Sequence, residues 1–214
     1  MEKTKVEMLI ERIVDKYGKA FRLNDDAHQI DHFHNVFTTG LYINDKLSLG
    51  HKPEKIAAVA YFHDMFSWSR YNHHQMSAHW VRTTDCPIIK EFSIEDRWDI
   101  SVGCGEHRAS FKGEFTCEFS ELMNSADREM PDVTGMRILS RSVRCSLSSA
   151  DNYDETLKRA LEHIHEKFGS SGYARYPAMY EQAFSDVLQE QRKTIDALTF
   201  DKAFELLKNP HAIN

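Results

Sequence analysis

The sequence predicts an all-α protein, and two observations lead to that prediction. Glycine and proline are scarce, at 9 and 5 of 214 residues, so few positions interrupt a helix. The apolar residues recur mostly at intervals of three and four, the spacing that places side chains on one face of a helix. With 41% hydrophobic residues and no low-complexity stretch, the chain can bury one sizeable core. We therefore expect a single all-α domain over residues 1–214.

The first three helices are predicted from apolar stripes and from the residues that end them. One stripe predicts a helix over residues 3–17, with Gly18 as its C-terminal stop. A second helix is expected over residues 30–47. Pro53 opens a third helix, because proline is tolerated at the first helical position. Residues 56–62 of this third helix are apolar on nearly every face, which predicts the central helix of the domain.

The rest of the chain continues the helical pattern. Four further helices are expected over residues 73–84, 94–106, 117–127 and 133–145. Loops are expected at residues 67–72 and 108–116. From residue 151 onward, two long amphipathic helices are predicted over residues 154–168 and 176–207, separated by a glycine- and serine-rich loop. These last helices carry no metal ligands in register, so we expect a C-terminal extension, about residues 151–208, that buttresses the domain or forms a homodimer surface.

The net charge, the first residues and the cysteines argue against several classes of protein. A net charge of −6 argues against a general grip on nucleic acid or on an anionic membrane, since both require many cationic contacts. The first twelve residues alternate charged and apolar side chains, so neither a secretory signal nor a membrane span is expected, and a cytoplasmic location is predicted. The cysteines lack a C-x-x-C pair, which favours reduced thiols; they are Cys86, Cys104, Cys117 and Cys145.

The dipeptide His63-Asp64 closes the apolar run of the third helix and predicts a metal site. An imidazole and a carboxylate at the buried end of a helix are costly to desolvate unless each finds a partner such as a cation. His32 upstream and Asp127 downstream complete a set of four candidate ligands. A mixed imidazole and carboxylate set suits a divalent ion, for which we expect Mn, Fe, Co, Ni, Mg or Zn.

Further histidines raise the number of ions that the site could hold. Nine of the twelve histidines lie between His28 and His107. A second ion is expected if His73 or His74 converges with His107 on the same centre, and Asp64 would then bridge the two ions. His28 lies four residues before His32, and we expect it to support the site or to face solvent.

The order of these ligands resembles the HD superfamily of metal-dependent phosphohydrolases, which is named after the His-Asp pair. The segments that carry the resemblance are residues 32–36, 58–64, 72–78, 106–108 and 124–128, within a core of about residues 26–131. Asn35 departs from the family pattern, because an arginine is frequent at that position. The resemblance implies a helical bundle around the metal site. It also implies hydrolysis of a phosphate ester or anhydride, most plausibly in a nucleotide, by attack of metal-bound water or hydroxide on phosphorus.

Residues beside the metal are candidates for binding the substrate. Asp64 is expected to act in catalysis as well as in metal binding. Arg70 and Arg108 are the nearest guanidinium groups in sequence and could hold phosphate oxygens in a bidentate fork, although each could also be a solvated surface charge. Trp68 and Tyr71 are candidates for a wall of the substrate site, where a nucleobase could stack.

Two alternatives to the hydrolase remain open at the level of sequence. Some relatives with extra histidines bind two irons and oxidise polyols or phosphonates, so a di-iron oxygenase of the same fold is the first alternative. The short interval between His107 and Asp127 favours the hydrolase. The second alternative is a module that senses a nucleotide without turning it over.

Overall fold

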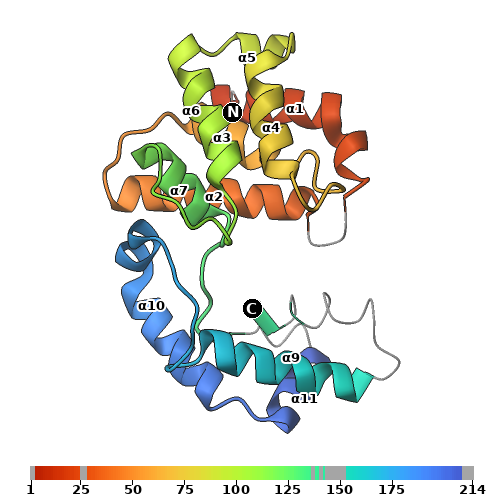
Figure 1. Ribbon diagram of the computed structural model, residues 1–214, viewed down its shortest axis with the longest axis vertical. Helices are drawn as coiled ribbons and strands as arrows, with labels where there is room; N and C mark the ends of the chain where they lie inside the picture. The colour runs from red at the N-terminus through yellow and green to blue at the C-terminus, as the bar shows by residue number, and fades with distance from the viewer. Residues whose placement is uncertain (1–2, 25–27, 136–137, 140–141, 143–152, 209–214) are drawn as a thin grey trace. The chain divides into compact units, whose positions relative to one another are not determined.

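The computed structural model describes residues 3–24, 28–135, 138–139, 142 and 153–208. Within these residues every regular element is an α-helix, so the prediction of an all-α fold is confirmed. Along the chain (Figure 1) the helices are α1 (Lys5–Phe21), α2 (Ile30–Lys46), α3 (Pro53–Phe62), α4 (His73–Thr83), α5 (Pro87–Lys90), α6 (Ile94–Glu106), α7 (Glu118–Ala126), α9 (Tyr153–Phe168), α10 (Ala178–Asp196) and α11 (Phe200–Lys208). Among the described residues, none of the helices combines the length and apolar content needed to cross a membrane.

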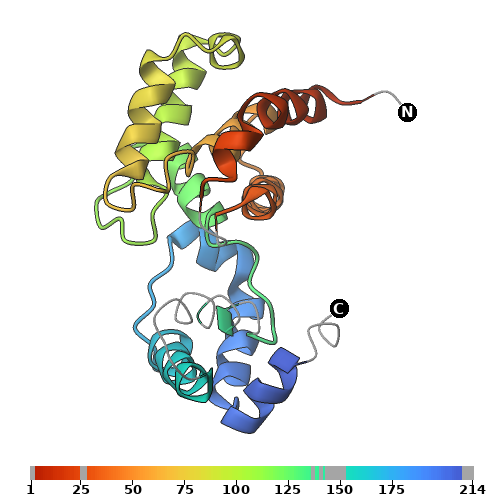
Figure 2. The ribbon, with the colours of Figure 1, turned by 90° about the vertical axis from the view of Figure 1, so that its right-hand side faces the viewer.

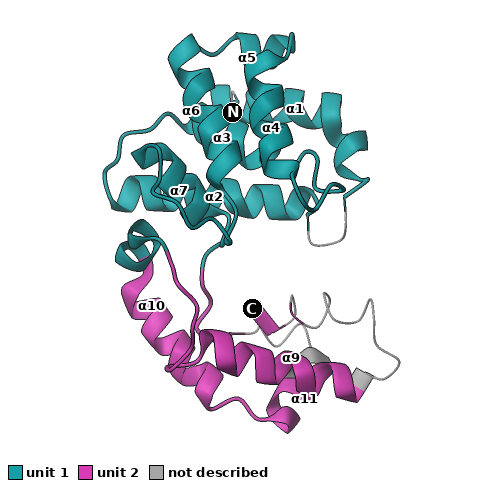
Figure 3. Ribbon diagram, in the orientation of Figure 1, with its two compact units in different colours: residues 1–130, 177–183 teal, residues 131–176, 184–214 magenta. Residues whose placement is uncertain are grey.

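The chain divides into two compact units (Figure 3). Unit 1 contains residues 1–130 and 177–183, and unit 2 contains residues 131–176 and 184–214. Helix α10 belongs to both units, and the backbone at Phe184, where unit 2 resumes, departs from helical angles (φ −129°, ψ 19°). The expectation of one domain with a C-terminal extension stays a prediction, because compactness does not measure whether two units unfold together.

Helix α3 is the centre of unit 1. Its residues 56–62 are at most 2% exposed, and helices α1, α2, α6 and α7 pack around it. Burying an apolar side chain contributes about 1.5–3 kcal/mol relative to leaving it exposed, so a helix that is apolar on all sides is stable only in such a position. The prediction that this run forms the central helix is confirmed.

The helix ends follow local side-chain chemistry. Thr4 and Glu7 form a capping box at the start of α1, in which each side chain accepts a hydrogen bond from the other residue's backbone N–H. The Ser93 hydroxyl accepts from the Asp96 N–H at the start of α6. Pro53 lies in the first turn of α3, where its missing N–H leaves no hydrogen bond unmade.

A close helix crossing packs α2 against α3 and α7. At Gly40 an added Cβ would lie 2.7 Å from Ile56 Cγ2 on α3 and 3.5 Å from Ala126 Cβ on α7. Only glycine allows the backbones to approach this closely. On the other side of α3, helices α4 and α6 lie side by side in both views of the ribbon (Figures 1 and 2).

Unit 2 has an apolar core of its own. The core residues come from α9, from α11 and from the segments around them; they are Leu139, Leu157, Ala160, Leu161, Ile164, Leu198 and Ala203. Helices α9 and α11 pack against each other. Gly135 adopts a positive φ of 68°, and a Cβ there would lie 2.9 Å from Ile195 Cγ1, so glycine is required for two independent reasons.

Two predictions are wrong, the end of the first helix and the continuity of the last one, and tertiary packing explains both. Helix α1 continues through Gly18 to Phe21, because Phe21 is fully buried with its ring centroid 5.0 Å from that of Phe33. The helix predicted over residues 176–207 is two helices, α10 and α11. Leu198 is buried between them, and Thr199 begins α11 by accepting a hydrogen bond from the Lys202 N–H on its side chain.

Two other differences concern short segments. Helix α5 was not predicted, because four residues are too few to show a helical period. The helix predicted over residues 133–145 begins instead as a turn at Val133 and Thr134, where the Gly135 N–H donates to the Asp132 carbonyl oxygen. Residues 136–137, 140–141 and 143–145 of that prediction lie outside the described residues.

Candidate metal centre

Six side chains that could bind a metal ion come together where helices of unit 1 begin or end. Helices α2 and α4 supply His32 and His73 from their first turns. Helices α3, α6 and α7 supply the residues at their C-caps, which are His63, His107 and Asp127. Asp64 follows His63 directly. These side chains form two groups that share Asp64, and in each group the ligand atoms lie within 4.8 Å of one another.

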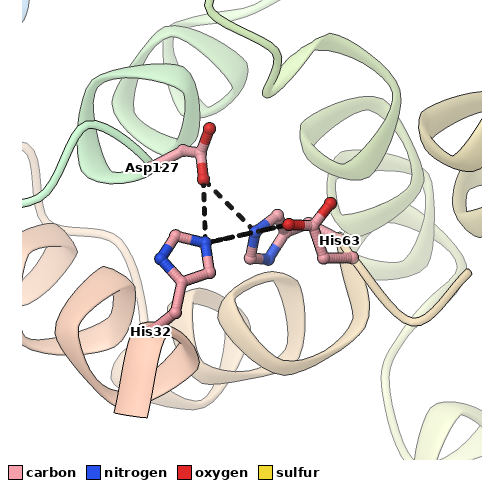
Figure 4. Close-up of side chains that lie close together, drawn as sticks. His32, His63 and Asp127 are labelled. Atoms are coloured by element: carbon pink, nitrogen blue, oxygen red, sulfur yellow. Dashed lines mark hydrogen bonds and ion pairs between the residues drawn. The ribbon is translucent and has the colours of Figure 1, made fainter. Parts of the chain in front are cut away.

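The first group contains His32, His63, Asp64 and Asp127. Figure 4 shows the two imidazoles and the Asp127 carboxylate pointing toward one another. Asp127 Oδ1 lies 3.2 Å from His32 Nε2 and 3.3 Å from His63 Nε2, and the two Nε2 atoms are 3.3 Å apart. Asp64 Oδ2 lies 3.3 Å from His63 Nε2 and 3.8 Å from His32 Nε2. The sequence thus identified four residues that the fold brings together.

The second group uses the other oxygen of Asp64. Asp64 Oδ1 lies 3.2 Å from His73 Nε2 and 3.3 Å from His107 Nε2, and these two nitrogens are 3.3 Å apart. Of the two alternatives raised by the sequence, His73 belongs to this group and His74 does not. Burial, followed by the nearby charge of Arg108, lowers the pKa of His74 to about 4, so this side chain is neutral.

Hydrogen bonds on the far side of three imidazoles fix which nitrogen faces the centre. The Nδ1 atoms lie 2.8 Å from Glu129 Oε1 for His32, 2.9 Å from the Ala60 carbonyl oxygen for His63, and 2.7 Å from the Cys104 carbonyl oxygen for His107. Since carboxylate and carbonyl oxygens only accept, each Nδ1 must carry the proton. In the neutral imidazoles, each Nε2 then presents a lone pair to its group, as a metal ligand must.

The spacing of the ligand atoms fits a metal ion. For bonds of about 2.1 Å, neighbouring ligands are about 3.0 Å apart in an octahedral site and about 3.4 Å apart in a tetrahedral one. Most of the distances within the two groups are 3.2–3.3 Å. Asp64 Oδ1 is buried and lacks a geometrically good hydrogen bond among the described residues. A buried carboxylate oxygen is costly to leave unpaired, and a cation is a partner that this donor set could bind.

The electrostatics of the centre favour a bound positive charge. Burial alone would raise the pKa of Asp64, but the charge of His63 and the imidazoles of His107, His63 and His73 beside its oxygens hold that pKa well below its usual range. The pKa of Asp127 is likewise held well below its usual range by His32 and His63, against its burial. Burial lowers the pKa of His63, yet Asp64 and Asp127 outweigh it and raise that pKa to about 10. The two carboxylates therefore stay ionised and stabilise a proton or a metal ion among the imidazoles.

The residues predicted to bind substrate lie outside both ligand groups. Arg108 donates from Nη1 to the Tyr71 carbonyl oxygen at 3.3 Å, which holds it near the loop before α4. Arg70 is exposed on that same loop, and the side chains of Trp68 and Tyr71 are 62% and 95% exposed. His28 Nε2 lies 3.7 Å from Asp64 Oδ2, so His28 adjoins the first group without belonging to it.

One residue beside the centre has no signal in the sequence. Glu129 is 8% exposed, accepts from His32 Nδ1 on Oε1 and from Asn35 Nδ2 on Oε2, and follows Asp127 by two residues. It lies beyond the end of α7, so no helical period relates it to the ligands. Asn35, which departs from the family pattern, thus donates to the carboxylate that orients His32.

Comparisons of the chain with models of protein families, with curated proteins and with solved structures found no match. The resemblance to the HD superfamily therefore depends on the motif residues and on their order along the chain.

Proposed function

We propose that the protein is a metal-dependent phosphohydrolase that cleaves a phosphate ester or anhydride in a nucleotide. The observation that carries this proposal is the position of Asp64, whose two oxygens face two different groups of ligand atoms. A carboxylate in that position could hold one ion or bridge two. The reaction class and the preference for a nucleotide come from the resemblance to the HD superfamily.

Four buried side chains would hold the metal ion. A bound divalent ion would supply Lewis-acid chemistry, lowering the pKa of a water and offsetting charge on phosphorus. His32, His63 and Asp127 would hold it at the buried ends of their helices, and Asp64 would complete the set. Because His63 is 1% and Asp64 3% exposed, little bulk water competes with these ligands.

The substrate would approach from the loop that precedes α4. Arg108 is held at this loop through the Tyr71 carbonyl oxygen and could direct its remaining N–H groups at phosphate oxygens. Arg70 could add a second cation from the same loop. The exposed rings of Trp68 and Tyr71 offer flat apolar surfaces on which a nucleobase could stack.

The test measures phosphate release from a panel of nucleotides by metal-free protein reloaded with Mn, Co, Ni, Mg, Fe or Zn. We expect activity that requires both a metal ion and Asp64, so Asp64→Ala should remove it. Glu121→Gln is the matched control, because Glu121 is a carboxylate on α7 that accepts from the Met179 N–H and belongs to neither ligand group. Nucleotide binding without any product, in every loaded form, would contradict the hydrolase and favour a sensing module.

A di-iron oxygenase is the second candidate, and the second ligand group favours it. The convergence of His73 and His107 on Asp64 provides the extra histidines that a centre with two ions requires. Loading the protein with iron and measuring oxygen uptake with polyols and phosphonates would separate the candidates. Oxygen uptake that depends on such a substrate, with two irons per chain and no phosphate release from nucleotides, would replace the hydrolase by the oxygenase.

A further inference from the structure

We propose that Glu129 is a positioning residue for the metal centre, and that it fixes the orientation and tautomer of His32. The inference depends only on the metal-binding part of the proposed function. Glu129 Oε1 accepts a hydrogen bond from His32 Nδ1 at 2.8 Å, and this nitrogen is on the side of the ring that points away from the centre. His32 is 5% exposed, so few water molecules can replace that partner.

The carboxylate is itself held in place from a second side. Glu129 Oε2 accepts from Asn35 Nδ2 at 3.2 Å, and Asn35 lies three residues after His32 on α2. Residues three apart on a helix lie on neighbouring positions of one face. Each Glu129 oxygen therefore accepts a hydrogen bond from a different residue of α2. The two bonds restrict rotation of the carboxylate and so fix the direction of the hydrogen bond from His32.

The backbone of Glu129 supports a functional role. Its φ is +59°, in the left-handed region that residues other than glycine seldom adopt. A glycine would adopt this conformation with less strain, yet the chain carries a glutamate whose side chain is buried. Backbone conformations of this kind persist where the surrounding structure holds them.

Helix α10 supplies a contact that holds this backbone. The Tyr180 hydroxyl donates to the Glu129 carbonyl oxygen at 2.9 Å, and Tyr180 is 3% exposed. Residues 177–183 belong to unit 1, so this contact lies within the unit that contains the metal centre. The first residues of α10 thus act on the centre through Glu129, a role for the C-terminal part of the chain that its amphipathic pattern did not suggest.

Cobalt(II) binding tests the proposal directly. We would measure the affinity of the metal-free protein for Co²⁺ by competition with a chelator, and follow the visible absorption of the bound ion. Removing a group that orients a metal-bound histidine typically weakens metal affinity by 10- to 100-fold. We expect Glu129→Gln, which keeps the shape and loses the charge, to weaken the tightest Co²⁺ site by about tenfold and to alter its absorption. Glu129→Gly, which removes the carboxylate and relieves the backbone, should weaken it by about 100-fold.

Two controls separate positioning from stability. Glu118→Gln changes a carboxylate on α7 that lies 3.2 Å from His51 Nε2 and belongs to neither ligand group, so its Co²⁺ affinity should match that of the unmodified protein. Thermal unfolding of the metal-free Glu129→Gly variant should occur near the unmodified temperature, because lost hydrogen bonds are offset by relief of backbone strain. The His32 Nδ1–H signal, followed by NMR in the zinc-loaded protein, should shift in that variant, because its hydrogen bond to the Glu129 carboxylate is lost.

The outcomes distinguish this proposal from the hydrolase itself. If Glu129→Gln and Glu129→Gly bind Co²⁺ as tightly as the unmodified protein, or only their unfolding temperature falls, the positioning role is wrong. Weakened Co²⁺ binding with a shift of the His32 Nδ1–H signal would support it, even in a protein that releases no phosphate from any nucleotide. An unmodified protein that binds no Co²⁺ would overturn both proposals.

Discussion

The two ligand groups on either side of Asp64 differ in charge and in how firmly their histidines are held. In the first group, both histidines have a partner on Nδ1, and two carboxylates face them. In the second group His107 has such a partner, whereas His73 Nδ1 is buried and lacks a hydrogen bond among the described residues. That group has one carboxylate, and Asp64 provides it.

This difference predicts an order of binding. A ligand that is already oriented loses less conformational freedom when the metal binds, and each additional carboxylate adds attraction for a divalent cation. We therefore expect the first group to take up an ion tightly and the second group to take up an ion weakly. The comparison also suggests why the two groups share one residue: Asp64 carries the charge that the second group otherwise lacks.

Removing the shared carboxylate should have the largest effect on metal affinity. Asp64→Asn deletes a charged ligand from both groups, so both binding steps should weaken by more than about 100-fold, beyond the range typical of a lost supporting hydrogen bond. Asp127→Asn should weaken only the first step. Calorimetric titration of both variants with Mn²⁺ measures this. Equal losses at both steps in Asp127→Asn would show that the two groups do not act as separate sites.

Removing a second-group histidine should have a smaller and more selective effect. His73→Ala leaves all four residues of the first group in place, so the protein should lose the weaker ion and keep the tighter one. We expect the affinity for the tighter ion to change by less than about tenfold. Metal analysis after dialysis gives the stoichiometry. Loss of both ions from this variant would mean that the two groups form one inseparable centre.

The smallest expected effect concerns the crossing that places α2 against α3 and α7. Gly40→Ala puts a Cβ 2.7 Å from Ile56 Cγ2, and overpacking of this kind destabilises a core by about 1–3 kcal/mol. Gly105→Ala on α6 is the matched control, since its Cβ would meet Ala78 Cβ at an ordinary 3.5 Å. Urea unfolding measures both. The first metal-binding step should also weaken in Gly40→Ala, because His32 lies on α2.

The sequence predicted the part of the site that is encoded in local patterns. His63 and Asp64 close an apolar run, and the structure ends α3 at Phe62 with His63 as its C-cap. His32, His107 and Asp127 were identified from short motifs that resemble those of the HD superfamily. Their convergence depends on how the helices pack, and the sequence carried that information only through the resemblance to a family.

The remaining features depend on tertiary contacts that leave no local pattern. The choice of His73 over His74 follows from the packing of α4 against α6, because adjacent histidines in a sequence are equivalent until a neighbour distinguishes them. Glu129 lies past the end of α7, where no period applies. The extension of α1 to Phe21 was missed for a related reason, since burial against Phe33 outweighs the weak helix propensity of Gly18.

Stepwise titration of the metal-free protein with Mn²⁺, followed by calorimetry, tests the central claim most directly. The claim is that Asp64 lies between two metal-binding groups of unequal strength. We predict two separate binding steps, a tight one and a weak one, that together take up two ions per chain and that both require Asp64. A protein that takes up no ion, or one whose uptake is unchanged in Asp64→Asn, would contradict it.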